Sequence, residues 1–251
     1  MLTSRIRTIA KRHLPPSLKR LLHRTSVSIV RAEPQSWIAR HLRFNRPFKQ
    51  MPLIERIEER ARITQAQGSQ PLWEGYGQSG SRRDSEQVRT NSSIGSLLIN
   101  VTMQRKPHLV VEFGTAFGIS GMYWLAGLEA NNAGHLLTFE PNALWATIAD
   151  ENLATISNRY TLTIGTFEEN LSIVDQRTEK IDLGFIDAIH TPAFVLPQLA
   201  LVQERCAPGA LIFLDDIEFS KDMHSCWEDI SHDRAYAASA AIGNLGLIEL
   251  R

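Results

Sequence analysis

Several features are scarce or missing in this 251-residue chain, and each absence narrows what the protein can be. It has only two cysteines, so neither a disulfide framework nor a cysteine-rich metal site is expected. Its longest uncharged runs, 113–128 and 188–203, have 16 residues each and are broken by Gly, Ser, His or Pro, whereas a membrane-spanning helix needs roughly 20 apolar residues. Lysine and arginine recur from Arg5 to Arg24, which leaves no apolar centre for a secretory signal. These absences predict a cytoplasmic protein that does not cross a bilayer.

The net charge of zero hides a separation of charge along the chain. Residues 1–50 contain 12 Lys and Arg against the single acid Glu33, and the rest of the chain contains 15 against 26. Leucines and isoleucines recur between these cations at near-helical spacing, which indicates short basic amphipathic helices. Such helices can lie on an anionic membrane surface, so peripheral contact with the inner face of a membrane is one expectation. The alternatives are a solvated, partly disordered flank, or a helix packed on the body or on a second subunit of a homodimer. Nucleic acid is not expected as a partner, because no reading module is present.

The rest of the chain has the composition and the alternating pattern of an α/β protein, with 43% hydrophobic and 22% charged residues. A helix is predicted over 52–67, with Ile54, Ile57 and Ala61 on one face, and it should pack on the catalytic domain. A loop rich in Gly, Ser and Gln follows over 67–83, and its Trp73 and Tyr76 either cover an acceptor pocket or pack against the body. We divide the chain into a basic helical extension with linker, 1–85, and a catalytic domain, 86–251.

Helices and strands alternate in the catalytic domain. The predicted helices cover 93–105, 120–128, 143–156, 193–205 and 221–230, and the predicted strands cover 108–113, 135–139, 161–164, 181–186, 210–214, 235–242 and 246–250. The last two strands are joined by Gly243-Asn-Leu-Gly246, which suits a closing hairpin.

The most informative stretch is Val110-Val-Glu-Phe-Gly-Thr-Ala-Phe-Gly-Ile-Ser120, in which an apolar strand leads into an acid, two glycines and the start of a helix. Gly114 permits a sharp turn and Gly118 permits close packing of the next helix on the strand. The spacing E-x-G-x-x-x-G differs from the G-x-G-x-x-G of dinucleotide sites, so a ligand without a pyrophosphate is favoured. Glu112 suits a ligand that carries an amine. A second strand ends in Glu140, 26 residues after Gly114, where a carboxylate can accept both hydroxyls of a ribose.

Together these segments resemble the class I S-adenosylmethionine-dependent methyltransferases, and most closely the O-methyltransferases of the catechol and caffeoyl-CoA type. The resemblance covers about 160 of the 251 residues. It implies a Rossmann-like, doubly wound, seven-stranded and mostly parallel sheet whose last strand is antiparallel. It also places the cofactor-binding residues at the strand ends. These are Glu112, Gly114, Gly118 and Ser120 around the methionine part, Glu140 at the ribose, Thr166 and Phe167 at the adenine, and Asp187 nearby. The alternatives are a helix N-cap for Ser120 and an exposed strand-end acid for Glu140.

A second group of polar residues follows the fourth and fifth strands of the domain. In metal-dependent relatives an Asp and an Asp-Asn pair hold a divalent cation at these positions; here Asp187 and Asp215 match, and Asp216 replaces the Asn. Three carboxylates suit Mg²⁺ or another divalent cation. The alternatives are polar contact with the cofactor, helix capping by Asp216 or direct binding of the acceptor. His190 lies where catechol-type enzymes carry a catalytic lysine, and an imidazole there can take a proton from an acceptor hydroxyl. His190 and Asp187 are therefore the predicted catalytic residues, with a structural histidine as the alternative.

The resemblance predicts an S-adenosylmethionine-dependent O-methyltransferase that acts on a hydroxyl of a small-molecule or glycan-like acceptor. Catechols, sugars and lipid-linked intermediates all stay open as acceptors. A nicotinamide-dependent oxidoreductase is the alternative enzyme, but the glycine spacing does not favour it. A catalytically silent scaffold tethered by its basic arm is the non-enzymatic alternative.

Overall fold

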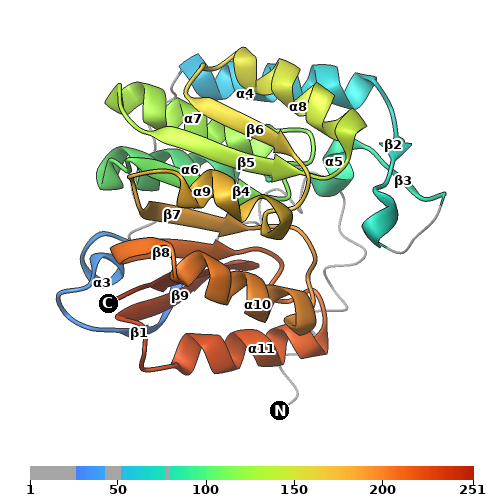
Figure 1. Ribbon diagram of the computed structural model, residues 1–251. Helices are drawn as coiled ribbons and strands as arrows, with labels where there is room; N and C mark the ends of the chain where they lie inside the picture. The colour runs from blue at the N-terminus through green and yellow to red at the C-terminus, as the bar shows by residue number, and fades with distance from the viewer. Residues whose placement is uncertain (1–26, 43–51, 77–79) are drawn as a thin grey trace, which may run out of the picture.

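The computed structural model describes residues 27–42, 52–76 and 80–251, which form one central sheet flanked by helices on both faces (Figure 1). The sheet has eight strands in the order β1-β9-β10-β8-β7-β4-β5-β6. Strands β6, β5, β4, β7 and β8 are parallel to one another, whereas β10, β9 and β1 join through antiparallel pairings. The predicted Rossmann-like sheet with an antiparallel last strand is confirmed, and β1 adds an eighth strand that was not predicted.

The predicted elements of the catalytic domain lie close to their predicted positions. Its strands are β4 (Leu109–Phe113), β5 (His135–Glu140), β6 (Tyr160–Ile164), β7 (Ile181–Ile186), β8 (Cys206–Leu214), β9 (Ala238–Ile242) and β10 (Leu245–Glu249). Its helices are α6 (Ser92–Arg105), α7 (Ile119–Asn131), α8 (Ala143–Ala154), η2 (Glu168–Asn170), α9 (Leu171–Asp175), α10 (Pro192–Gln203) and α11 (Lys221–His232). Of these, η2 and α9 were not predicted. The predicted hairpin between the last two strands is confirmed by the β9–β10 pairing.

Strand β4 lies in the middle of the sheet, and all five of its residues are buried. Val110 belongs to the core under α6 and α7, whereas Val111 and Phe113 belong to the core under α9, α10 and α11. A strand covered on both faces needs a continuous apolar run, which explains why the sequence signal for β4 was clear. Glu112 is the exception in this run, and it is fully buried.

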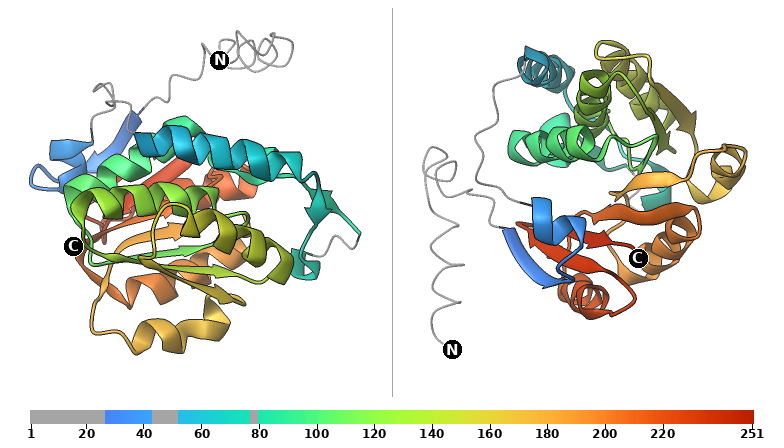
Figure 2. Two further views of the ribbon diagram at one scale, coloured as in Figure 1. Left: turned by 90° about the horizontal axis from the view of Figure 1, so that it is seen from above. Right: turned by 90° about the vertical axis from the view of Figure 1, so that its left-hand side faces the viewer.

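Part of the predicted helical extension is a strand. Strand β1 (Val27–Ala32) pairs with β9, and Figure 2 shows it in blue at the sheet edge beside the C-terminal strands in red. The short helix α3 (Trp37–His41) follows, and the carboxylate of Glu249 on β10 accepts hydrogen bonds from the first two amides of this helix, at 2.7 and 2.9 Å. Residues 27–42 therefore share hydrogen bonds with the far end of the chain. The predicted basic helices before Arg24 lie outside the described residues.

The predicted helix over 52–67 is confirmed as α4 (Pro52–Ala66), which buries Ile57 and Ala61. The predicted loop after it contains a small hairpin, β2 (Gln70–Pro71) with β3 (Arg82–Arg83), and the single turn η1 (Glu74–Tyr76). Helix α5 (Ser85–Val88) leads into the domain. The hairpin lies beyond the carboxyl ends of β4 and β5 (Figure 1). Within the described part of the chain, no helix combines the length and the apolar character that crossing a membrane requires.

Candidate active site

The turn after β4 brings the ends of two neighbouring strands into contact. Gly114 has a φ of +89°, and a Cβ atom at this position would lie 1.5 Å from the carbonyl oxygen of Asp187. Only glycine fits here, because any side chain would collide with the backbone that follows β7. Gly118 has a φ of +79° and is the N-cap of α7, with Ala149 of α8 close to its Cα. The predicted sharp turn at Gly114 is present, whereas the close neighbour of Gly118 is α8 and not the preceding strand, on which packing was predicted.

Ser120 lies inside the first turn of α7, two residues after the N-cap, so the N-cap alternative for it is wrong. It is buried and lines the pocket described below. Its neighbour Glu112 accepts a hydrogen bond from Thr138 at 2.9 Å. Burial raises the pKa of Glu112 to about 7, although Ser120, Thr138 and Trp124 partly oppose this shift. One carboxylate oxygen of Glu112 still has no hydrogen-bond partner of good geometry.

Glu140, at the end of β5, is only 2% exposed, so the exposed-acid alternative is wrong. Its two carboxylate oxygens accept hydrogen bonds from the amides of Ala116 and Asn142, each at 2.8 Å. Burial raises its pKa to about 7, while the two amides act in the opposite direction. The carboxylate is therefore fixed in place and ties the glycine turn to the end of β5.

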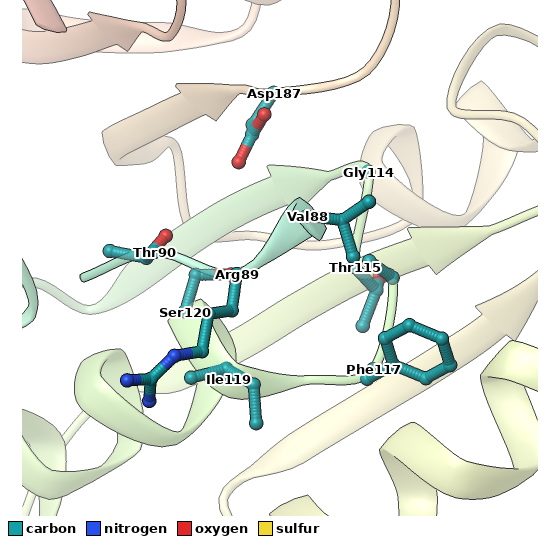
Figure 3. Close-up of a pocket in the computed structure, with 10 residues that line it drawn as sticks. Val88, Arg89, Thr90, Gly114, Thr115, Phe117, Ile119, Ser120 and Asp187 are labelled. Carbon is teal, nitrogen blue, oxygen red and sulfur yellow. The ribbon is translucent and has the colours of Figure 1, made fainter. Parts of the chain in front are cut away.

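A pocket with about 220 Å³ of open space lies between the glycine turn and the end of β7 (Figure 3). It brings together three of the predicted residues, Gly114, Ser120 and Asp187. The pocket is also lined by Val88, Arg89 and Thr90, which the sequence analysis did not identify. No motif marks this segment; only the tertiary structure brings it to the glycine turn. Glu112, Glu140 and Thr166 lie outside the pocket lining.

The side chains of the two residues predicted to border the adenine lie in different surroundings. Phe167 is 2% exposed, and its ring stacks on Phe113 with centroids 4.7 Å apart. Its side chain belongs to the core, so only its main chain can border a ligand. Thr166 lies at the surface, where its hydroxyl and amide both donate to Glu169, at 2.8 and 3.0 Å.

The second predicted group of residues meets beyond the ends of β7 and β8. His190 Nε2 lies 3.6 Å from an oxygen of Asp216 and 3.9 Å from an oxygen of Asp187. Burial, and then the neighbouring charge of Asp215, raise the pKa of Asp187 well above its usual range. The pKa of Asp215 is also raised, first by burial and then by Asp216. The two carboxyl groups raise each other's cost of ionisation, so the pair titrates as a unit.

Asp216 is oriented by a residue that the sequence analysis missed. It has a left-handed backbone with a φ of +53°, and its side chain accepts a hydrogen bond from the amide of Asn244 in the β9–β10 hairpin. The N-cap of α11 is Ser220, so Asp216 does not cap that helix. In the part of the chain that the structure describes, no group of three or more His, Cys, Asp or Glu side chains is arranged to hold a metal ion.

Aromatic residues lie next to these polar side chains. Phe219 is 64% exposed, and its ring centroid lies 5.4 Å from that of His190. Tyr76 is half-buried in η1, with its ring edge-on to Trp73. Burial, followed by the charges of Glu140 and Asp187, raises the pKa of Tyr76, so this ring lies near both acids. Both aromatics therefore border the rim of the sheet.

Comparison with known proteins agrees with this geometry. Residues 111–217 match a family model described as a methyltransferase domain. The fold is similar to that of the O-methyltransferase TomG from Streptomyces achromogenes, solved in complex with SAM, at 16% identity and a TM-score of 0.58, over 80% of this chain and 91% of that one. A putative O-methyltransferase from Klebsiella pneumoniae shares 21% identity with a TM-score of 0.56, over 81% of this chain and 92% of that one.

A putative caffeoyl-CoA O-methyltransferase from Staphylococcus aureus shares 17% identity with a TM-score of 0.58, over 80% of this chain and 93% of that one. The family match begins at β4 and ends just after β8, so it contains the glycine turn, Glu140, Asp187, His190 and both acids after β8. Residues 111–217 therefore match a methyltransferase domain, and the chain has the Rossmann-like fold of these O-methyltransferase structures.

Proposed function

We propose that this protein transfers a methyl group from S-adenosylmethionine to a hydroxyl of a small-molecule or glycan-like acceptor. The observation that carries the proposal is the pocket at the glycine turn, with fixed or buried carboxylates beside it. Glu112 and Glu140 both have a pKa raised to about 7 by burial. A ligand that brings a sulfonium and an ammonium group would supply the positive charge that these acids lack.

The residues at the site fit the parts of this cofactor. The buried oxygen of Glu112 that lacks a hydrogen-bond partner of good geometry is next to Ser120, which lines the pocket. The pocket lies at the glycine turn and contains Ser120, where the resemblance places the methionine part of the cofactor. We assign it to the amino-acid end, and the ribose to Glu140.

The chemistry requires two things of the acceptor side of the site. When bound, S-adenosylmethionine supplies a methyl group on sulfur that an oxygen nucleophile can attack. The chain must hold the acceptor oxygen in line with that methyl group, at a distance of roughly 3 Å. It must also remove the proton of the hydroxyl, and His190 is placed for this role. The carboxylate of Asp216, 3.6 Å from His190 Nε2, would stabilise the imidazolium that forms.

The three acids after β7 and β8 do not point to one common centre. The carboxyl groups of Asp187 and Asp215 converge, but that of Asp216 is turned towards Asn244 and His190. As they lie, the three acids do not fit a cation. A chelator decides the question: turnover should persist in EDTA and change less than twofold when Mg²⁺ is added. Loss of turnover in EDTA and its recovery with Mg²⁺ would show that the acids rearrange around a metal.

Calorimetry is the direct test of the proposed function. S-adenosylmethionine and S-adenosylhomocysteine should both bind, and NAD should give no heat. Labelled S-adenosylmethionine should then transfer its methyl group to a member of a panel of hydroxylated compounds that includes catechols, sugars and lipid-linked sugars. Binding of NAD alone would support the oxidoreductase alternative. Absence of binding by all three ligands would leave the silent scaffold.

A further inference from the structure

Helix α4 lies outside the residues that match the methyltransferase family. Its polar side chains nevertheless bond to one residue that lines the pocket, Arg89, and through Asn152 to another, Phe117. The helix is already anchored by Ile57 and Ala61, which are fully buried. Polar contacts are therefore not needed merely to attach it to the domain. Two sets of such contacts, which we call the Glu58 clamp and the Asn152 clamp, connect α4 to residues that line the pocket.

The Glu58 clamp joins α4, α7 and the segment before α6. One oxygen of Glu58 accepts a hydrogen bond from Arg89 at 3.2 Å, and the other accepts one from the hydroxyl of Tyr123. Arg89 is also paired with Glu86, at 2.8 Å. The side chains of Arg89 and Glu58 are 17% and 30% exposed, so solvent screens this pair less than an ion pair that is fully at the surface. Because Arg89 and its neighbours Val88 and Thr90 line the pocket, the clamp fixes that wall.

The Asn152 clamp joins α4 and α8 to the glycine turn. The amide of Asn152 is fully buried, and its oxygen accepts two hydrogen bonds from Arg60, at 3.0 and 2.7 Å. Its nitrogen donates to the hydroxyl of Thr64 at 2.9 Å and to the carbonyl of Phe117 at 2.8 Å. Every donor and acceptor of this amide is used. A fully satisfied buried network holds its members in one arrangement, so it fixes the backbone at Phe117.

The two clamps therefore end at two residues that line one pocket, Arg89 and Phe117 (Figure 3). We propose that α4 is a positioning element for the cofactor: it fixes both of these lining segments and so the fit of the amino-acid end of S-adenosylmethionine. This inference rests on the proposed function. The pocket contains Ser120, expected near the methionine carboxylate, but neither Glu140 nor Thr166, expected at the ribose and adenine. The clamps should therefore act on one end of the ligand only.

Two ligands separate this role from a general contribution to folding. S-adenosylhomocysteine has the amino-acid end, whereas 5′-methylthioadenosine keeps the adenosine and the thioether but lacks that end. Calorimetry with both should be done on the wild-type chain, on Glu58→Gln and on Arg60→Met. The matched control is Glu59→Gln, which breaks the exposed pair between Glu59 and Arg62 on the same helix. Circular dichroism and melting curves establish that each variant is folded.

We expect Glu58→Gln and Arg60→Met to weaken binding of S-adenosylhomocysteine at least fivefold and binding of 5′-methylthioadenosine less than twofold. Glu59→Gln should change the affinity for neither ligand. Arg60→Lys, which keeps the charge and one donor, should recover part of the loss. If Arg60→Met does not fold, Glu58→Gln decides alone, because it changes one atom at a half-buried position.

Three results would overturn the inference. Unchanged affinity for S-adenosylhomocysteine in a folded Glu58→Gln variant would show that the clamp does not shape the pocket. An equal loss for both ligands would show that α4 only supports the fold. If the wild-type chain binds 5′-methylthioadenosine but not S-adenosylhomocysteine, or binds neither, the proposed function fails as well, and the wild-type titration alone reveals it.

Discussion

The carboxyl ends of the parallel strands form one edge of the sheet, which we call the rim. Its two halves, beyond β4 and β5 and beyond β7 and β8, differ in how their acids are held. Beyond β4 and β5, Glu140 has backbone donors on both oxygens, and the glycine turn is confined by the backbone at Asp187. Beyond β7 and β8, burial and the neighbouring carboxylates raise the pKa of Asp187, and Asp216 faces His190. Glu140 on the first half has backbone partners for both oxygens before any ligand binds, whereas the second half contains more negative charge than its own partners neutralise.

This difference matches a division of labour between cofactor and acceptor. A site for a constant ligand gains from groups that are fixed in advance, because no free energy is lost in ordering them during binding. A site that carries out proton transfer needs groups whose charge can change. The exposed Phe219 beside His190 adds an apolar surface on the second half only. We therefore expect substitutions on the first half to change affinity and substitutions on the second half to change the rate.

The largest effect is expected for His190→Gln, which removes the base of the second half. A general base contributes on the order of 100-fold to 10,000-fold, so kcat should fall at least 100-fold. Affinity for S-adenosylhomocysteine should change less than twofold, because His190 does not line the cofactor pocket. Steady-state kinetics with an acceptor found by the panel and calorimetry with S-adenosylhomocysteine measure the two quantities. A variant that keeps full kcat would return His190 to a structural role.

The next effect tests the first half. Glu140→Ala removes the acceptor for the ribose hydroxyls and also the partner of two backbone amides. Affinity for S-adenosylhomocysteine should fall at least tenfold, with a smaller change in kcat at saturating cofactor. Glu151→Ala, on the exposed face of α8, is the control and should be silent. Equal affinity in Glu140→Ala and wild type would remove Glu140 from the cofactor site.

The sequence predicted the first half of the rim better than the second, and the reason is local. The glycine turn follows a buried strand directly, so one continuous segment of the sequence contains the strand, the turn and the start of the helix. Glu140 is likewise set by the end of the neighbouring strand. For Asp216 the sequence gives the position but not the orientation. That orientation depends on Asn244, which comes from a hairpin 28 residues further along the chain.

Other misses have the same cause. Strand β1 pairs with β9, more than 200 residues away, so its six residues contain no local sign of their partner. The sequence places Phe167 after β6, but stacking on Phe113 decides that its ring enters the core. The pocket wall at Arg89 is set by Glu58 on α4. Local patterns give elements and their order, whereas packing between distant segments decides which side chains meet.

A third prediction concerns pH and the first half. Burial raises the pKa of Glu140 to about 7, so this carboxyl is partly protonated at neutral pH. A bound ribose donates to the ionised form, which lowers the pKa in the complex. Cofactor affinity should therefore rise with pH through about 7, by less than tenfold between pH 6 and 8, and binding should release protons. Calorimetry in buffers of different ionisation enthalpy measures this release. If Glu140→Gln releases as many protons as wild type, another group is responsible.

The smallest effect on the rim is expected from the basic arm. Residues 1–26 contain seven Lys and Arg and no acid, and neither half of the rim depends on them in the proposal above. Deleting them should change affinity for S-adenosylhomocysteine less than twofold. The same deletion should abolish sedimentation with vesicles rich in phosphatidylserine, since each cation near such a surface contributes on the order of 1 kcal/mol. Wild-type binding to these vesicles should fall steeply with added salt. If the full chain does not bind the vesicles and the deletion lowers the affinity for S-adenosylhomocysteine instead, the arm contributes to the cofactor site.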